Sequence, residues 1–157
     1  MQGITPCLWF DTQAEEAVNY YVQVIEDSGI DGITHYGPNQ VGPEGQVWTV
    51  AFHLKDQPFL AFNGGPVFKF TPAISFILNC DTQEQIDHLW EALSDGGVKM
   101  ECGWVTDRFG VSWQIVPAAL GAWMLDEDPE RFGRVMAALL TMTKLDLATL
   151  EAAYNQS

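Results

Sequence analysis

The side chains best suited to catalysis or metal binding are scattered along this sequence. Its three histidines, His35, His53 and His88, fall in a short strand of a loop-rich stretch, in a second strand and in a helix. None belongs to a His-x-x-x-His or Cys-x-x-Cys pair, the spacings that bring two metal ligands together. Cys102 precedes Gly103-Trp104 and is a candidate nucleophile, but no adjacent base is evident. A buried structural cysteine is therefore the favoured interpretation.

Two loops combine residue types that are often found beside ligands. Asn63-Gly64-Gly65 follows a strand-like run, and glycines there would let backbone amides approach a ligand, although a strand-ending turn explains them equally well. Phe68 and Phe70 form either an aromatic lid or part of the core. Asp107 and Arg108 form either a charged pair at the mouth of a cavity or a hairpin-turn ion pair, which contributes little to stability if exposed.

The composition indicates a soluble globular domain. Of 157 residues, 47% are hydrophobic and 12% aromatic, enough to bury a sizeable core. The formal net charge of −14, from 21 acidic and 7 basic side chains, repels phosphate backbones and anionic membrane surfaces. Three cysteines in apolar stretches, with no leader and no membrane-spanning run, indicate the reducing cytoplasm. We therefore expect neither nucleic acid nor membrane as a partner.

Turn signals and apolar periodicity predict two similar series of elements. The first series is a strand at 4–10, an amphipathic helix capped by Asp11, and strands near 33–36, 46–54 and 58–62. The second is a strand at 73–79, a helix capped by Asp81, and short strands at 98–102, 104–106 and 111–116. Two further helices begin near Asp128 and Asp146. The first of them carries an apolar stripe, formed by Val135, Met136, Leu139 and Leu140.

The same triplet follows the first strand of both series, which indicates a duplicated unit. Asp11-Thr12-Gln13 and Asp81-Thr82-Gln83 lie 70 residues apart, and each follows a strand and opens a helix. Agreement of strand, helix and three following strands favours duplication over chance. Two βαβββ units that each leave a sheet face uncovered are expected to pair and to enclose a cavity. We predict one α+β domain over 1–157, with modules at 1–70 and 71–117 and a helical extension at 118–157.

Paired βαβββ modules resemble the vicinal-oxygen-chelate superfamily, the fold of glyoxalases, bleomycin-resistance proteins and dihydroxybiphenyl dioxygenases. Within it, the chain is similar to the PhnB-like group, which is also labelled 3-demethylubiquinone 3-methyltransferase-like. The similarity covers most of residues 4–154. The stretches that carry it are ITPCLWFDTQAEEAVNYY, DQPFLAFNGG, FKFTPAISFIL, CGWVTDRFGVSWQIVP and RVMAALLTMTKLDLATLEAAY.

The resemblance also locates the positions at which relatives bind a metal. Metal-dependent members place His or Glu ligands on inward strand positions, which correspond here to Ile4, Ala73, Gln114 and Asn63. Ile and Ala have no donor atoms, and neutral amides supply little charge to a divalent cation. We therefore expect neither a metal nor another cofactor.

If Ile4 faces the cavity, strand alternation predicts which residues line it. Pro6, Leu8 and Phe10 then face inward, while Cys7 and Trp9 pack under a helix. A mostly apolar wall with a few amides and hydroxyls suits a small, partly apolar ligand. The expected ligand-binding residues are Leu8, Phe10, Asn63, Gly64, Phe68, Phe70, Ser75, Trp104, Ser112 and Gln114.

The sequence favours a metal-free protein that binds a small molecule in a cavity between the modules. A metal-independent enzyme is the alternative, and it needs a nucleophile or base inside the cavity. A purely structural or dimerisation module is a further alternative. Methyltransfer is not expected, because no glycine-rich turn joins a strand to a helix. We also expect a homodimer, with the 118–157 stripe covering either the sheet or a second copy.

Overall fold

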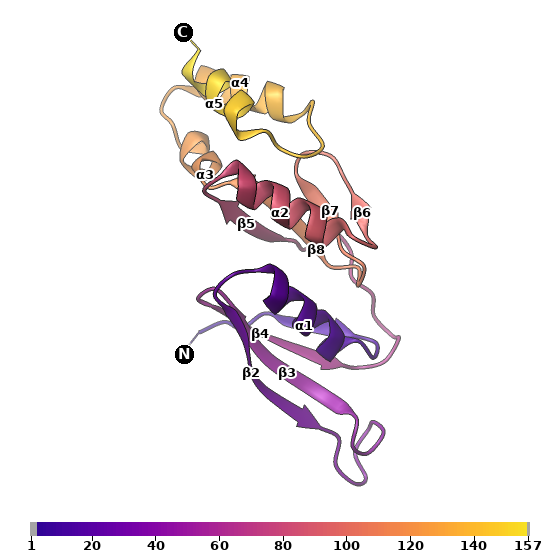
Figure 1. The fold of residues 1–157 in the computed structure, drawn as a ribbon. Coiled ribbons are helices and arrows are strands. Elements are labelled where there is room, and N and C mark those ends of the chain that lie inside the picture. The colour runs from indigo at the N-terminus through magenta and orange to yellow at the C-terminus, as the bar shows by residue number, and fades with distance from the viewer. Residues whose placement is uncertain (1–2, 157) are drawn as a thin grey trace. The chain divides into compact units, whose positions relative to one another are not determined.

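The computed structural model describes residues 3–156 and divides the chain into two compact units. The first unit runs up to Phe70 and the second begins at Thr71. Figure 1 shows that each unit contains a sheet with a helix against it, and that the second unit also carries the C-terminal helices. Residues 1, 2 and 157, which the expected domain limits include, lie outside the described residues.

The first unit is one βαβββ module. Its sheet has the order β1-β4-β3-β2, in which β1 runs parallel to β4 and the other neighbours are antiparallel. The buried face of α1 packs over this sheet through Ala17, Val18 and Tyr21. The elements are β1 (Cys7–Phe10), α1 (Ala14–Val24), β2 (Ser28–His35), β3 (Val47–Leu54) and β4 (Gln57–Asn63).

The second unit repeats this topology. Its sheet has the order β5-β8-β7-β6, with β5 parallel to β8, and α2 follows the first strand as α1 does in the first unit. The elements are β5 (Phe76–Cys80), α2 (Gln83–Ser94), β6 (Val98–Lys99), β7 (Trp104–Thr106) and β8 (Ser112–Pro117). The α+β fold of two βαβββ modules is thus confirmed.

Both expected helix caps were placed too early in the chain. α2 is capped by Thr82, whose hydroxyl accepts the amide of Gln85 at 3.2 Å, not by Asp81. α1 begins after Gln13, and its first amide, that of Ala14, is bound by the side chain of Asn63. A sequence pattern shows where a helix begins only to within a few residues, because the capping group can come from elsewhere in the fold.

Three helices follow the second sheet: α3 (Ala119–Met124), α4 (Pro129–Leu139) and α5 (Leu147–Asn155). Asp128 caps α4 by accepting the Glu130 amide at 3.0 Å, as the sequence predicts, whereas α3 was not predicted. Within residues 3–156, no helix is long and apolar enough to span a membrane. A second core joins these helices to the end of β8, formed by Val116, Trp123, Val135, Leu139, Leu145 and Leu150.

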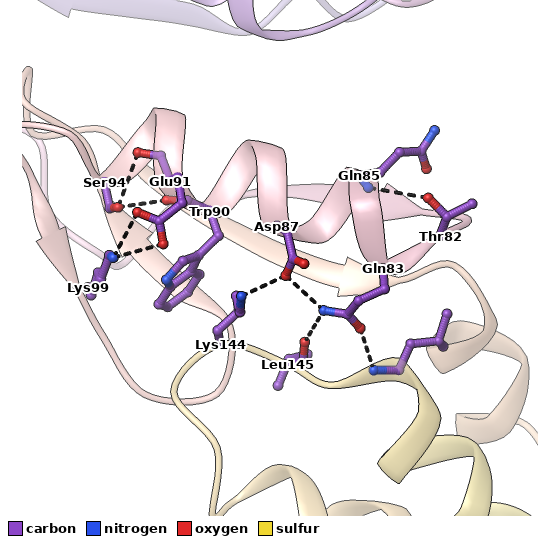
Figure 2. Close-up of polar contacts among 11 residues, drawn as sticks. Thr82, Gln83, Gln85, Asp87, Trp90, Glu91, Ser94, Lys99, Lys144 and Leu145 are labelled. Carbon is purple, nitrogen blue, oxygen red and sulfur yellow. Dashed lines mark hydrogen bonds and ion pairs between the residues drawn. The ribbon is translucent and has the colours of Figure 1, made fainter.

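A polar network attaches the C-terminal segment to the start of α2 (Figure 2). The Gln83 side chain donates to the Leu145 carbonyl at 3.1 Å and accepts the Leu147 amide at 2.8 Å. It also donates to Asp87, which pairs with Lys144 at 2.7 Å. One glutamine therefore fixes the backbone just before and within α5.

Acid should loosen this attachment before it affects the first unit. Hydrogen bonds from Lys144 and then Gln83 lower the pKa of Asp87, and a hydrogen bond from Thr149 lowers the pKa of Asp146, the cap of α5. A carboxylate with a lowered folded-state pKa stabilises the fold above its unfolded pKa, and this stabilisation is lost as the pH falls through the folded value. Methyl NMR signals of this second core should broaden as the pH falls below 3.8, the ordinary pKa of an Asp carboxyl, while those of the first unit stay sharp. Simultaneous broadening in the first unit and the second core would contradict this assignment.

Candidate functional site

The second sheet has one covered and one open face. Alternate side chains of β7 and β8 are fully buried against α2, and the side chains between them point to the other face. There Ile77 stays 54% exposed, and Trp104 and Gln114 are only half-buried. The covered face is formed by Val105, Trp113 and Ile115 with Ile86, Trp90 and Leu93 of α2.

A fixed amide lies in the middle of the open face. Gln114 is paired with Ile77 on β5 and with Trp104 on β7, so these three side chains form one row across the sheet. The Gln114 Nε2 donates to the Ser75 hydroxyl at 2.9 Å. Its Oε1 has no hydrogen bond within residues 3–156. The row thus offers an oriented acceptor between an aliphatic and an aromatic side chain.

A groove of about 670 Å³ adjoins this row at Trp104. Met100, Cys102 and Trp104 give it a mainly apolar lining. Lys99 also lines it, but its ammonium is paired with Glu91 at 3.1 Å (Figure 2). Because that positive charge is compensated and Glu101 also lines the groove, the groove disfavours anions and suits a mostly apolar molecule.

The turn before Trp104 is held by the C-terminal segment. Cys102 and Gly103 both adopt positive φ, at 60° and 80°. Their amides donate to the carbonyls of Met142 and Thr143 at 2.9 and 2.8 Å. Thr143 also lines the groove, and no sequence pattern predicts this because the contact depends on how the C-terminal segment packs.

Three of the expected ligand-binding residues, Ser75, Trp104 and Gln114, therefore come together on one open face. Ser112 shares their face but is only 1% exposed, with its hydroxyl 3.5 Å from that of Thr106. A ligand cannot reach Ser112 without displacing its neighbours. Met100 is a groove residue that the sequence argument missed, because it lies in the irregular connection between β6 and β7.

Asp107 and Arg108 have separate structural roles. The Asp107 side chain is buried, and it accepts the backbone amides of Phe109 and Val111 and the indole N–H of Trp113 at 2.8 Å. Arg108 donates to the Asp95 carboxylate at 2.7 Å, at the end of α2. Asp107 shapes the β7–β8 turn, and Arg108 ties this turn to α2.

In the first sheet, the expected direction of the first strand is wrong. Leu8 and Phe10 are buried on the face covered by α1, and Cys7 and Trp9 lie on the open face. Alternation counted from an inward Ile4 predicts the opposite face, but Ile4 precedes β1 and is exposed. A shift of one residue reverses every side chain of a strand. Leu8 and Phe10 are core residues.

The loop Asn63-Gly64-Gly65 is an internal brace and not a ligand cradle. The Gly64 and Gly65 amides donate to the Phe10 and Asp11 carbonyls, and the Gly65 carbonyl accepts the Trp9 indole N–H at 2.8 Å. A Cβ on Gly64 would lie 2.4 Å from the Trp9 ring. Gly64 is therefore needed for the close packing of Trp9, which corrects the expected role of this loop.

Asn63 itself joins three parts of the first unit. Its Oδ1 accepts the Ala14 amide at 2.9 Å and its Nδ2 donates to the Val47 carbonyl at 3.0 Å. Asn63→Ala should lower the free energy of unfolding by about 1–2 kcal/mol. It removes the cap of α1 and leaves the Ala14 amide and the Val47 carbonyl without this hydrogen-bond partner. Urea titration measures this loss. Asn79→Ala, an exposed strand position, is the control and should change stability by less than about 0.5 kcal/mol.

The two phenylalanines expected near the ligand lie on different faces. Phe68 packs edge-on against Trp9, with ring centroids 5.0 Å apart, and remains largely exposed on the open face. Phe70 packs against the buried Phe10 at 5.1 Å. Phe68 belongs with an aromatic row of Phe62 and Trp9, and Phe70 extends the core.

The residues at the family's metal positions do not fit a divalent cation. Ile4 and Ala73 are exposed carbon side chains that lie before β1 and β5. Both amide atoms of Asn63 are already bonded within the first unit, and the Gln114 amide is bound to Ser75. Across residues 3–156, no three His, Cys, Asp or Glu side chains gather as metal ligands. This donor set offers a cation little charge and few oxygens.

Comparison with known proteins agrees with this architecture. A family model described as 3-demethylubiquinone-9 3-methyltransferase matches residues 2–116. A Bacillus cereus structure described as a putative 3-demethylubiquinone-9 3-methyltransferase, PhnB protein, is 36% identical, with a TM-score of 0.69, over 74% of this chain and 100% of that chain. Protein PA1353 from Pseudomonas aeruginosa is 22% identical over 73% of this chain and 96% of its own, with a TM-score of 0.62. No curated protein matches the chain.

The family match ends within β8, before α3. The similarity expected for residues 134–154 is therefore not part of it. The segment that holds the Cys102-Gly103 turn and supplies Thr143 to the groove lies outside the matched residues.

Proposed function

Because this chain belongs to the 3-demethylubiquinone-9 3-methyltransferase family, the PhnB-like group of the vicinal-oxygen-chelate fold, we propose that it binds a small, uncharged, partly apolar molecule without a metal. The ligand lies against the open face of the second sheet. The observation that carries this proposal is the row of Ile77, Gln114 and Trp104, with a fixed amide and a neighbouring groove.

Each part of this surface has a role in recognition. Trp104 and Ile77 provide apolar area above and beside the ligand, and Gln114 accepts one hydrogen bond from it. The chain's charge of −14 and the compensated Lys99 disfavour anionic ligands. The protein therefore recognises its ligand by shape and by one polar contact.

Methyltransfer is not included in the proposal, although the family description names it. The turns from β1 to α1 and from β5 to α2 contain no glycine, whereas a nucleotide-like methyl donor is usually bound at a glycine-rich turn between strand and helix. Both sheets are also of the βαβββ type, not doubly wound.

A screen of uncharged aromatic fragments by ligand-observed NMR tests the proposal. At least one fragment should bind, and Gln114→Leu and Trp104→Ala should each weaken it about tenfold, the effect of losing one hydrogen bond or a comparable apolar contact. Gln57→Leu, an exposed glutamine of the first sheet, is the control and should leave binding unchanged. The proposal fails if no fragment binds, or if neither Gln114→Leu nor Trp104→Ala changes the fragment affinity.

We also propose that the chain acts in the cytoplasm as a homodimer. Its large net charge opposes association with nucleic acid and anionic membranes. The C-terminal stripe does not carry the dimer, since Val135 and Leu139 are buried within the second unit; only Leu140, 62% exposed, points outward. Sedimentation equilibrium should give twice the chain mass of 17.5 kDa, and a monomer at micromolar concentration would refute the dimer.

A further inference from the structure

The first sheet carries a histidine–carboxylate pair on its open face. His53 Nδ1 lies 2.9 and 3.1 Å from the two carboxylate oxygens of Asp31. His53 alternates along β3 with the buried Phe52 and Leu54, so its imidazole lies on the face that α1 does not cover. The two side chains are 40% and 51% exposed. Since a carboxylate can only accept, the proton of this hydrogen bond belongs to Nδ1, and Nε2 of the neutral ring is an acceptor.

The backbone is shaped around this pair. The register of β2 and β3 shifts between Ile30 and Gly32, so Asp31 is the additional residue of a β-bulge. A bulge redirects a side chain that regular alternation would point elsewhere. Gly29 lies directly opposite His53, and a Cβ there would be 3.1 Å from His53 Cε1. The imidazole thus fills the space above Gly29, and the bulge supplies its partner.

Small residues form a floor beside the imidazole. Ala51 lies two residues before His53 on the same face and is paired with Gly32. A Cβ at Gly32 would meet no atom within 4 Å, so the space above this pair is open. Beyond the floor, the hydroxyls of Thr34 and Thr49 lie 2.6 Å apart.

The floor has the size of a small ring system. Thr49 and His53 are four residues apart in one strand, which corresponds to about 13 Å. Leu60 and Phe62 of β4 lie beside Ala51 and Thr49 and give the floor an apolar border. Nε2 of His53 has no hydrogen bond within residues 3–156. A planar molecule of one or two rings fits between the threonine pair and the imidazole.

We propose that His53 and Asp31 form a proton-accepting dyad for a small hydroxylated aromatic molecule that lies over Ala51 and Gly32. The O–H bond of the ligand breaks, and its proton moves to Nε2 of His53. The electron pair stays on the ligand oxygen, and Asp31 stabilises the imidazolium through Nδ1–H. This assigns proton transfer to the first sheet and goes beyond the proposed function, because it needs neither Gln114 nor Trp104.

Binding of 4-nitrophenol tests the dyad, because this phenol changes its absorbance when it loses its proton. At a fixed, mildly acidic pH, the wild-type protein should increase the phenolate fraction. His53→Gln should abolish the increase and Asp31→Asn should reduce it several-fold. His35→Gln and His88→Gln, the matched controls, should keep it. An unchanged response in His53→Gln would overturn the proposal.

A second measurement detects the tautomer of His53 in the protein without any ligand. Nitrogen-15 NMR should find neutral His53 as the Nδ1–H tautomer in the wild-type protein and as a mixture in Asp31→Asn. An Nε2–H tautomer in the wild type would also overturn the proposal. Gln114→Leu should retain the nitrophenol response, so a failure of the second-sheet site and a failure of the dyad are separate results.

Discussion

Asp107→Ala is expected to cost about 3–4 kcal/mol of unfolding free energy, because one buried carboxylate satisfies three donors. These donors are the backbone amides of Phe109 and Val111 and the indole N–H of Trp113, a residue only 1% exposed. Without the carboxylate these donors lose this acceptor, and two of them, the Val111 amide and the Trp113 indole, lie in the buried interior. The free energy of unfolding, measured by urea titration of tryptophan fluorescence, reports this loss.

Two variants separate this burial effect from loss of charge. Asp107→Asn keeps one acceptor oxygen but turns an amide NH₂ toward donors, so it should still cost about 2 kcal/mol. Asp95→Ala removes the exposed partner of Arg108 and should cost at most about 1 kcal/mol. Equal losses in Asp95→Ala and Asp107→Ala would show that the buried network is not what stabilises the turn.

Gly103→Ala is expected to cost about 2–4 kcal/mol and to abolish ligand binding on the second sheet. Gly103 has φ of 80°, which costs an L side chain roughly 1–2 kcal/mol. A Cβ there would lie 2.8 Å from the Ile115 carbonyl oxygen and 3.0 Å from Leu145 Cγ. The turn must therefore move, and Trp104, the next residue, moves with it.

Gly133→Ala is the matched control for this substitution. Gly133 lies inside α4, and a Cβ there would meet no atom within 4 Å. Replacing an unhindered helix glycine by alanine should stabilise the protein by about 0.5–1 kcal/mol. Thermal unfolding and fragment binding, measured on both variants, test the pair. If Gly103→Ala binds the fragment as tightly as the wild-type protein does, the turn does not orient Trp104 for a ligand.

The local patterns of the sequence were sufficient for the fold. The repeated Asp-Thr-Gln triplet follows the first strand of both modules, and each module has the predicted βαβββ series of elements. The short α3 was missed, because a six-residue helix gives little periodic signal. Asp128 was correctly identified as a cap, since its acceptor and the amide that it binds are neighbours in sequence.

The sites were harder to predict, because their residues depend on register and on distant contacts. Ser75 and Gln114 lie on one face of the second sheet, as strand alternation predicts, and their role in ligand binding stays a prediction. Leu8 and Phe10 were assigned to the wrong face because the count began one residue out of phase. Asp31 could not have been found by alternation, since a bulge displaces it. Thr143 reaches the groove only through the packing of the C-terminal segment.

Mapping amide chemical shifts with a bound fragment locates the ligand on the protein. We expect the largest changes at Ser75, Trp104 and Gln114, while the buried face of α2 does not respond. Changes confined to α2 and the C-terminal helices, with that row unaffected, would contradict this expectation.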